Sequence, residues 1–303
     1  MSKNLSPHFR AVLQALFVTF LWSTSWVLVK IGLEDIPPLP FAGLRYTLAF
    51  LCLLPFAIRS CQLAPLRGRS SSTWARLILL GLLFYTATQG AVFLSLFYLP
   101  ALTVSLLLSF SPVLVALLGI TLLSEQPTPI QWAGTGLYLI GVLIYLYPAS
   151  LPGHQVIGLI VAILGVLANA LSSILGRDVN RSGELEPMSV TVVSMGLGGM
   201  ALLIGGVIAQ GLPRLTLSNW AIILWLAAVN SAFAFTLWNR TLRTLSAMES
   251  SIINNTMLFQ IAVLAWVFLG EDLSWRQVVG MLLAALGTLA VQLRPRSRSP
   301  HSR

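Results

Sequence analysis

Residues 125–141 read EQPTPIQWAGTGLYLIG, and residues 271–287 read EDLSWRQVVGMLLAALG. Glu, Gln, Gly and Gly occupy the same four places in both stretches, although the chain of 303 residues contains only nine acidic side chains. The match extends without a gap over residues 98–147 and 244–293. A shift of one residue continues it upstream, where it pairs Ser25 with Ser172, Lys30 with Arg177 and Pro40 with Pro187. The sequence therefore contains two copies of a unit of about 140 residues.

The composition indicates which solvent surrounds this repeat. Hydrophobic residues make up 56% of the chain and charged residues only 9%, and the mean hydropathy is +0.85. A soluble protein carries about 25% charged residues, so this chain cannot cover a water-facing surface. Its two cysteines, Cys52 and Cys61, do not form a CxxC motif and indicate neither a metal site nor a redox compartment.

Ten apolar stretches follow one another, each of roughly the 20 residues that a membrane-crossing helix needs. They are residues 11–33, 39–58, 74–97, 101–123, 129–147, 156–176, 187–209, 219–239, 245–269 and 275–293. Their interiors do not alternate between apolar and polar residues, which excludes a transmembrane β-barrel. Each copy of the repeat holds five stretches, an odd number, so the second copy enters the membrane in the opposite orientation. We predict an all-α integral membrane protein with ten transmembrane helices in two inverted five-helix repeats, residues 11–147 and 156–293, followed by a basic cytoplasmic tail, residues 294–303.

The Lys and Arg residues predict the orientation of the helices. With the N-terminus inside the cell, the outer segments hold only Lys30, Arg214 and Arg276, and Arg45 lies within a helix. The inner segments hold fourteen: Lys3, Arg10, Arg59, Arg67, Arg69, Arg76, Arg177, Arg181, Arg240, Arg243, Arg294, Arg296, Arg298 and Arg303. Such an excess is typical of cytoplasmic loops, so we predict a multi-pass protein of the inner or plasma membrane with both termini in the cytoplasm. The pI near 10.4 then reflects topology and contact with the lipid bilayer, and we expect no nucleic-acid partner.

The repeated residues fit structural roles. A Thr or Ser three residues before Gln131 and Gln277 completes a capping box of the S/T-x-x-Q form at the start of a helix. Glu125 and Glu271 come just before these helices, where the helix dipole favours a carboxylate. Small residues spaced seven apart share one helix face and allow close helix approach, and the four are Gly134, Gly141, Gly280 and Gly287.

Enzymatic motifs are missing from the sequence. The only lysines, Lys3 and Lys30, are not followed by Ser or Thr as a P-loop requires. The three histidines, His8, His154 and His301, fall in tails or loops, and no HExxH motif occurs. We therefore predict a protein that is not an enzyme, that uses no cofactor or metal, and that draws its energy from a cargo gradient or a coupled ion.

Polar side chains within the apolar stretches are the remaining lead, because each is costly in lipid unless it faces protein or water. The first and sixth stretches carry such residues at positions that the repeat pairs, and the third and ninth add a tyrosine and several amides. Packing between helices is the alternative explanation. The candidates for a cargo-binding cavity are Trp22, Ser25, Trp26, Tyr85, Gln89, Asn169, Ser172, Asn255 and Gln260.

Two charged residues also lie within apolar stretches. Arg45 comes five residues after Pro40, roughly 8 Å along its helix at 1.5 Å per residue. It can extend outward to the membrane interface, or it can bind a cargo carboxylate through its two-pronged donor edge. Glu249 can pair with Arg240 or Arg243, or it can carry a coupled proton. The sequence leaves both choices open.

Ten helices in two inverted halves, each ending in Glu–x5–Gln–x2–Gly–x6–Gly, resemble the EamA-type members of the drug/metabolite transporter superfamily. LWSTSWVLVKIGL (residues 21–33) and PPLPFAGLRY (residues 37–46) are similar to that family's first two helices. The resemblance implies a basket of helices around a central cavity, helices five and ten apart from it, and export or exchange of small metabolites, often amino acids. The family often has Gly and Asn after the first-helix Trp, where this chain has Ser23 and Thr24, so the class of cargo stays open.

We therefore expect a secondary transporter that exports small organic metabolites, such as amino acids or related compounds, by alternating access. An uncoupled facilitator and a channel-like pore are the alternatives, and an intramembrane enzyme is favoured less. A continuous pore would need polar stripes along several helices, whereas the polar residues here cluster near mid-membrane. The sequence indicates neither a coupling ion nor an oligomeric state.

Overall fold

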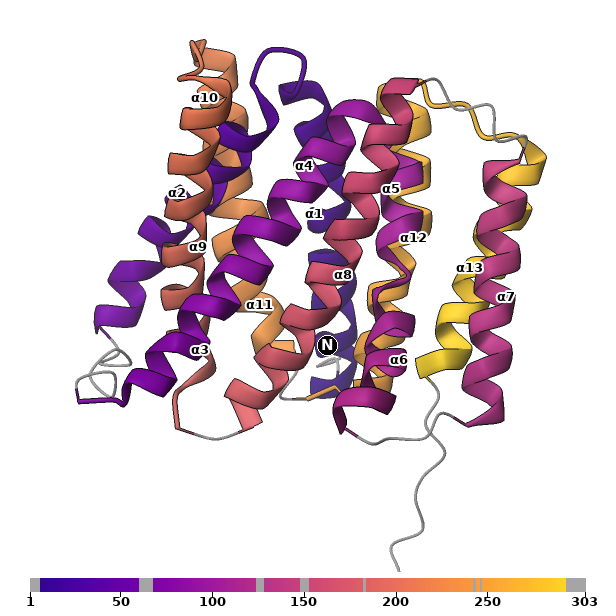
Figure 1. The fold of residues 1–303 in the computed structure, drawn as a ribbon, viewed down its shortest axis with the longest axis horizontal. Coiled ribbons are helices and arrows are strands. Elements are labelled where there is room, and N and C mark those ends of the chain that lie inside the picture. Colours follow the sequence, from indigo (N-terminus) through magenta and orange to yellow (C-terminus); the bar gives the residue numbers. More distant parts are fainter. Residues whose placement is uncertain are drawn as a thin grey trace, which may run out of the picture.

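The protein is a bundle of helices in a computed structural model that describes residues 6–59, 68–123, 128–147, 153–181, 184–241, 244–245 and 247–292 (Figure 1). The predicted roles of Glu125, Arg243 and the tail 294–303 lie outside these residues. In chain order the helices are α1 (Pro7–Gly32), α2 (Pro38–Arg59), α3 (Ser71–Gly81), η2 (Leu82–Thr88), α4 (Gln89–Tyr98), α5 (Ala101–Leu108), α6 (Ser111–Leu123), α7 (Pro129–Leu146), α8 (Gly153–Arg181), α9 (Pro187–Gln210), α10 (Leu217–Trp225), η3 (Leu226–Phe233), α11 (Ala234–Thr241), α12 (Ala247–Leu269) and α13 (Trp275–Gln292).

The helical spans of the described residues are apolar along most of their length. Within the described residues, eight spans are long and apolar enough to cross it, and Ala101–Val115 and Trp275–Val291 are shorter apolar helices. No strand occurs in the described part of the chain. Large apolar side chains cover the outside of the bundle, as a lipid environment requires, and examples are Leu143 at 70%, Phe268 at 64% and Ile208 at 81% exposure. The predicted all-α membrane fold is confirmed.

The third span of each repeat contains a π-helical segment. Leu82–Thr88 lies between α3 and α4, and Leu226–Phe233 lies between α10 and α11. π-Helical turns make i→i+5 hydrogen bonds and are frequent at functional sites. The two segments therefore place the same irregularity in both halves of the molecule.

Helices of opposite repeats pack against one another along the bundle. α2 lies along α9, α1 along α12, and α4 along α8. Glycine allows the closest approach: a Cβ added at Gly43 of α2 would lie 2.4 Å from the Cα of Leu203 on α9. Fully buried apolar side chains such as Phe41, Phe93 and Met195 fill the core between these helices.

α7 and α13 form a separate pair at one side of the bundle, on the right in Figure 1. Their glycines bring the two backbones into contact. A Cβ added at Gly134 would lie 2.7 Å from the carbonyl oxygen of Gly287, and one at Gly141 would lie 2.6 Å from that of Gly280. This is the placement of helices five and ten that the family resemblance implied.

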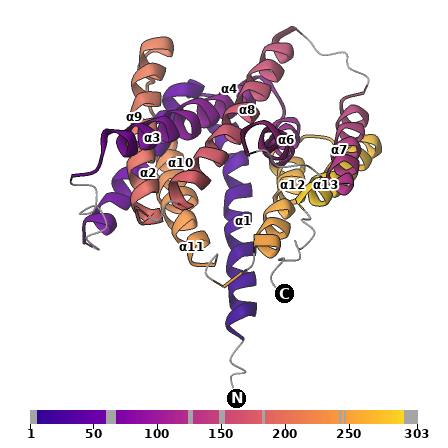
Figure 2. The ribbon, with the colours of Figure 1, turned by 60° about the horizontal axis from the view of Figure 1, so that its bottom comes forward.

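The two ends of the bundle differ in the chain segments that they hold. α1 begins and α13 ends at the same end, which is the lower one in Figures 1 and 2. We call it the terminal end, and we call the opposite end, where α1 ends and α13 begins, the distal end.

Candidate functional site

Arg45 of α2 is a charged side chain inside the bundle and is only 6% exposed. Its Nε donates a hydrogen bond to the hydroxyl of Ser231 in η3, at 3.1 Å. The guanidinium carbon lies 5.2 Å from the ring centre of Tyr46 and 6.0 Å from that of Phe93 on α4. Arg45 thus joins the first repeat to the π-helical segment of the second.

A second polar link joins α2 to α4 beside Arg45. The Tyr46 hydroxyl donates to Oε1 of Gln89 at 2.7 Å, and the Tyr46 ring packs edge-on against Tyr85 with centroids 5.4 Å apart. Tyr46 and Tyr85 are buried, whereas Gln89 is half-buried. Two of the predicted cavity residues, Tyr85 and Gln89, therefore share a group with Arg45. We call this group the arginine cluster and define it as Arg45, Tyr46, Tyr85, Gln89, Phe93 and Ser231.

A neighbouring group connects α1 to η3. Asn230 is fully buried, and its Nδ2 donates to the Leu21 carbonyl and, at 3.2 Å, to the Thr24 hydroxyl. The indole N–H of Trp22 donates to the Asn230 carbonyl at 3.1 Å. Asn230 Oδ1 is buried without a hydrogen-bond partner among the described residues. Trp22 is thus hydrogen-bonded to η3 at Asn230, the residue that directly precedes Ser231 of the arginine cluster.

Two of the predicted amides bridge helices elsewhere. Gln260 of α12 accepts a hydrogen bond from Ser23 at 2.9 Å and donates to Thr19 at 3.3 Å, both on α1. Asn169 of α8 donates to Ser111 of α6 at 2.8 Å. Partners of this kind satisfy amides at packed helix interfaces. These contacts do not join either residue to the arginine cluster, and their role as cargo contacts stays a prediction.

The other predicted cavity residues are placed singly. Ser25 and Ser172 are buried, and each hydroxyl donates to the carbonyl three residues back in its own helix, as helical serines commonly do. Trp26 packs against the main core, and Asn255 is half-buried on α12. For these four the cargo role also stays a prediction.

Glu249 lies in the first turn of α12, at the terminal end of the bundle. Its Oε1 is 2.8 Å from Nε2 of His8 in α1, and the two side chains are 41% and 55% exposed. The carboxylate is therefore at the rim of the bundle rather than among the buried polar groups. A proton-carrying role for it stays a prediction.

The repeated Gln residues close the first turns of α7 and α13. Oε1 of Gln131 accepts from the backbone N–H of Thr128, and Oε1 of Gln277 accepts from that of Ser274, both at 2.9 Å. Gln131 also donates to the Val291 carbonyl of α13 at 3.1 Å. The same side chain therefore starts one helix and fastens it to its neighbour.

Glu271 caps a helix of the other repeat. Its two carboxylate oxygens accept from the backbone N–H groups of Ala101 at 2.7 Å and Leu102 at 3.1 Å, at the start of α5. A carboxylate there satisfies free N–H groups and interacts favourably with the helix dipole. The sequence placed Glu271 at the start of the helix that follows it, whereas its hydrogen bonds go to α5.

Lys30 binds the end of α4, on the other side of the turn that joins α4 to α5. Its Nζ donates to the carbonyls of Leu96 at 2.5 Å and Leu99 at 2.8 Å, where α4 ends. A cation at a helix C-terminus complements the dipole. Lys30 and Glu271 together fix the α4–α5 turn at the distal end.

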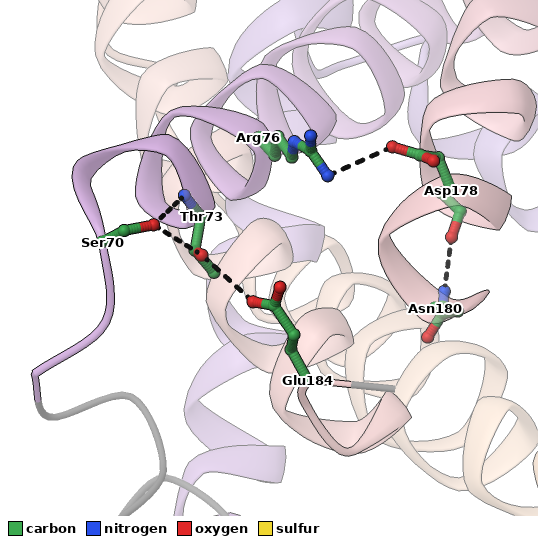
Figure 3. Close-up of polar contacts among 7 residues, drawn as sticks. Ser70, Thr73, Arg76, Asp178, Asn180 and Glu184 are labelled. Atoms are coloured by element: carbon green, nitrogen blue, oxygen red, sulfur yellow. Dashed lines mark hydrogen bonds and ion pairs between the residues drawn. The ribbon is translucent and has the colours of Figure 1, made fainter. Parts of the chain in front are cut away.

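Polar contacts at the terminal end join α3 of the first repeat to the second repeat (Figure 3). Arg76 pairs with Asp178 of α8 at 3.3 Å, and Thr73 donates to the Glu184 carboxylate at 3.3 Å. Exposed pairs of this kind contribute about 0 to 1 kcal/mol. The stronger support is a buried apolar cluster that contains Leu77 and Leu80 of α3, Val179 of α8, Leu185, and Val190 of α9.

Three residues at these sites were not singled out from the sequence. Tyr46 and Phe93 belong to the arginine cluster, and the hydrogen-bonding role of Lys30 was not predicted. Tyr46 had one visible signal, because it directly follows Arg45 in an apolar helix. Phe93 and the partners of Lys30 had none, because their roles depend on how α4 packs.

The comparisons with known proteins agree with this architecture. The model of the EamA-like transporter family matches residues 9–147 and 156–293. The uncharacterized transporter YvbV of Bacillus subtilis is 26% identical over 302 residues, which cover 96% of this chain and 94% of that protein. A Salmonella typhimurium protein named probable amino-acid metabolite efflux pump is 27% identical over 285 residues, which cover 90% of this chain and 91% of that protein. The uncharacterized inner membrane transporter YedA of Escherichia coli is 26% identical over 251 residues, which cover 80% of this chain and 77% of that protein.

One solved crystal structure superposes with a TM-score of 0.66 at 19% identity, over 93% of this chain and 97% of its own. It shows the same fold. The two family matches together span nearly the whole sequence, and they coincide with an all-helical membrane bundle. The chain belongs to the EamA-like transporter family of the drug/metabolite transporter superfamily and is a multi-pass membrane transporter.

Proposed function

We propose that this transporter exports small organic metabolites, such as amino acids or related compounds, across the inner or plasma membrane. The observation that supports the proposal is the arginine cluster, a buried polar group contributed by α2 and α4 of one repeat and η3 of the other. Secondary transporters bind cargo between inverted repeats. The name of the Salmonella relative agrees with this class of cargo.

Alternating access requires the contacts between the repeats to change at each end in turn. At the distal end, Glu271 of the second repeat caps α5 of the first. At the terminal end, Arg76 and Thr73 of α3 contact Asp178 and Glu184. We infer that each set breaks when its end opens to water.

We expect saturable flux from the purified protein in proteoliposomes. Each of the twenty standard amino acids would be tested separately. Vesicles loaded with the unlabelled amino acid should take up the same amino acid in labelled form by exchange. The rate of uptake should level off as the external concentration of the labelled amino acid rises. Uptake that rises linearly without limit would indicate a channel-like pore. An absence of flux for all amino acids and for their amides and amines would contradict the proposal.

An uncoupled facilitator is the second candidate. The position of Glu249 favours it, because this carboxylate is at the rim with His8 and away from the arginine cluster. A pH gradient imposed on the same vesicles separates the two functions. A proton-coupled carrier uses the pH gradient to accumulate cargo against the concentration gradient of the cargo. A facilitator only brings the cargo to equal concentrations on the two sides.

We expect the terminal end to face the cytoplasm. A fluorescent reporter fused to the C-terminus should fold and fluoresce, and alkaline phosphatase inserted between α9 and α10, at residues 211–216, should be active outside. The physical reason is the basic residues of the terminal end, which the positive-inside rule retains in the cytoplasm. The reverse pattern of activities would refute this orientation.

A further inference from the structure

We propose that Arg45 binds the carboxylate of the cargo, so that the transported compounds are monocarboxylates, with amino acids among them. This inference rests on the proposed transport function and adds the chemical group that its site recognises. Its support comes from the charge, hydrogen bonds and position of Arg45.

Arg45 is a buried cation that has no ion-pair partner among the described residues. The ion pairs between described residues are His8–Glu249, Arg69–Glu184 and Arg76–Asp178, and none of them includes Arg45. The acidic residues of the described chain lie at the ends of helices or in turns: Glu34, Asp35, Asp178, Glu184, Glu186, Glu249, Glu271 and Asp272. An uncompensated charge in a membrane helix is costly and marks functional positions. A cargo carboxylate would supply the missing charge.

The two terminal nitrogens of the Arg45 guanidinium are available to bind a ligand. Nε is used by Ser231, and the two terminal nitrogens make no hydrogen bond to any described residue. Those nitrogens form a planar pair of donors that matches the two oxygens of a carboxylate. Gln89 offers a further donor in the same cluster, because Tyr46 occupies its Oε1 and its amide nitrogen has no partner in the described part of the chain. Gln89 is half-buried, whereas Arg45, Tyr46 and Ser231 are buried.

The direction of the side chain argues against a purely interfacial role. Ser231 follows Asn230, and Asn230 bonds to Leu21, which lies near the middle of α1. The guanidinium of Arg45 therefore points into the bundle and not toward lipid headgroups. The rings of Tyr46 and Phe93 lie beside the guanidinium, at 5.2 and 6.0 Å from their centroids.

The single charge selects the kind of anion. Lys30, near the end of α1, is occupied by two carbonyls at the distal end. One guanidinium neutralises one carboxylate, whereas a phosphate dianion would leave a negative charge buried. We therefore expect monocarboxylates rather than phosphate compounds.

Ligand binding by the purified full-length protein tests the proposal. Melting temperature would be measured with each amino acid, with its amide, with the amine that lacks the carboxyl group, and with inorganic phosphate, because a ligand that binds the folded state raises the melting temperature. We expect at least one amino acid to stabilise the protein and its amide and amine to fail. Arg45→Gln should weaken that affinity about 10- to 100-fold, and Arg45→Lys should weaken it less.

Arg59→Gln is the matched control, because Arg59 lies exposed at the end of the same helix; it should leave affinity unchanged. Arg45→Gln without ligand should melt at the same temperature as the wild type or higher, since it removes a buried unpaired charge. Unchanged affinity in Arg45→Gln, equal binding of acids and amides, binding of phosphate instead, or no binding of any amino acid would each overturn the proposal. If amides then show saturable flux in proteoliposomes, the transport function stands and only the role of Arg45 falls.

Discussion

Replacing Gly141 by alanine is expected to destabilise the protein by about 1 to 3 kcal/mol, the usual cost of forcing an extra methyl group into a packed interface. The new Cβ would lie 2.5 Å from the backbone nitrogen of Ala284 and 2.6 Å from the carbonyl oxygen of Gly280. Both atoms belong to the backbone of α13, so no side chain can rotate away and the two helices must separate. The melting temperature of the purified full chain, measured in lipid nanodiscs, should fall by several degrees.

Gly136→Ala provides a matched control in the same helix. A Cβ at Gly136 meets nothing within 4 Å, and alanine is better than glycine in a helix interior by roughly 0.5 to 1 kcal/mol. This variant should therefore melt at the same temperature as the wild type or slightly higher. If both variants lose the same stability, the contact between α7 and α13 is not what the glycines provide.

The glycine positions could be predicted from the sequence because they depend on local periodicity. Gly134 and Gly141 are seven residues apart, which places them on one helix face, and the repeat supplies the same spacing at Gly280 and Gly287. The ten apolar spans have the same local origin, since length and hydropathy alone define them. Only the choice of partner helix needs the tertiary structure.

The arginine cluster could be predicted only in part. Arg45 and Gln89 are conspicuous in the sequence because each is polar in an apolar helix. Their association through Tyr46 depends on the direction of α4 after the π-helical segment Leu82–Thr88. A single irregular turn rotates every later side chain of the helix, and the residues of that turn carry no Gly or Pro signal. Tertiary packing therefore decided which polar residues meet.

Replacing Glu271 by alanine is expected to destabilise the protein by about 2 to 4 kcal/mol, which combines a lost helix cap with unsatisfied buried donors. The carboxylate accepts from the backbone N–H groups of Ala101 and Leu102, which are 0% and 2% exposed. Water cannot easily replace the lost acceptor at such buried positions. Lys30 would keep its bonds to the end of α4, so the damage should centre on α5.

Two further variants separate the cap from the charge. Glu271→Gln keeps an oxygen acceptor but loses the favourable interaction of a negative charge with the helix N-terminus, so it should lose less stability than Glu271→Ala. Asp272→Ala removes the neighbouring carboxylate, which is exposed, and it should leave the melting temperature unchanged. Equal losses in Glu271→Ala and Asp272→Ala would show that the negative charge of this turn matters and the cap does not.

Hydrogen exchange locates the effect of Glu271→Ala within the molecule. The first amides of α5 should lose protection, because their hydrogen bonds to the carboxylate are gone, while amides in the middle of α2 and α9 should exchange at rates close to those of the wild type. Since Glu271 belongs to the second repeat and α5 to the first, exchange confined to the first turn of α5 would show that the carboxylate joins the two halves at the distal end. Exchange that rises uniformly through the bundle, or not at all in α5, would contradict this role and would remove Glu271 from the contacts that alternate during transport.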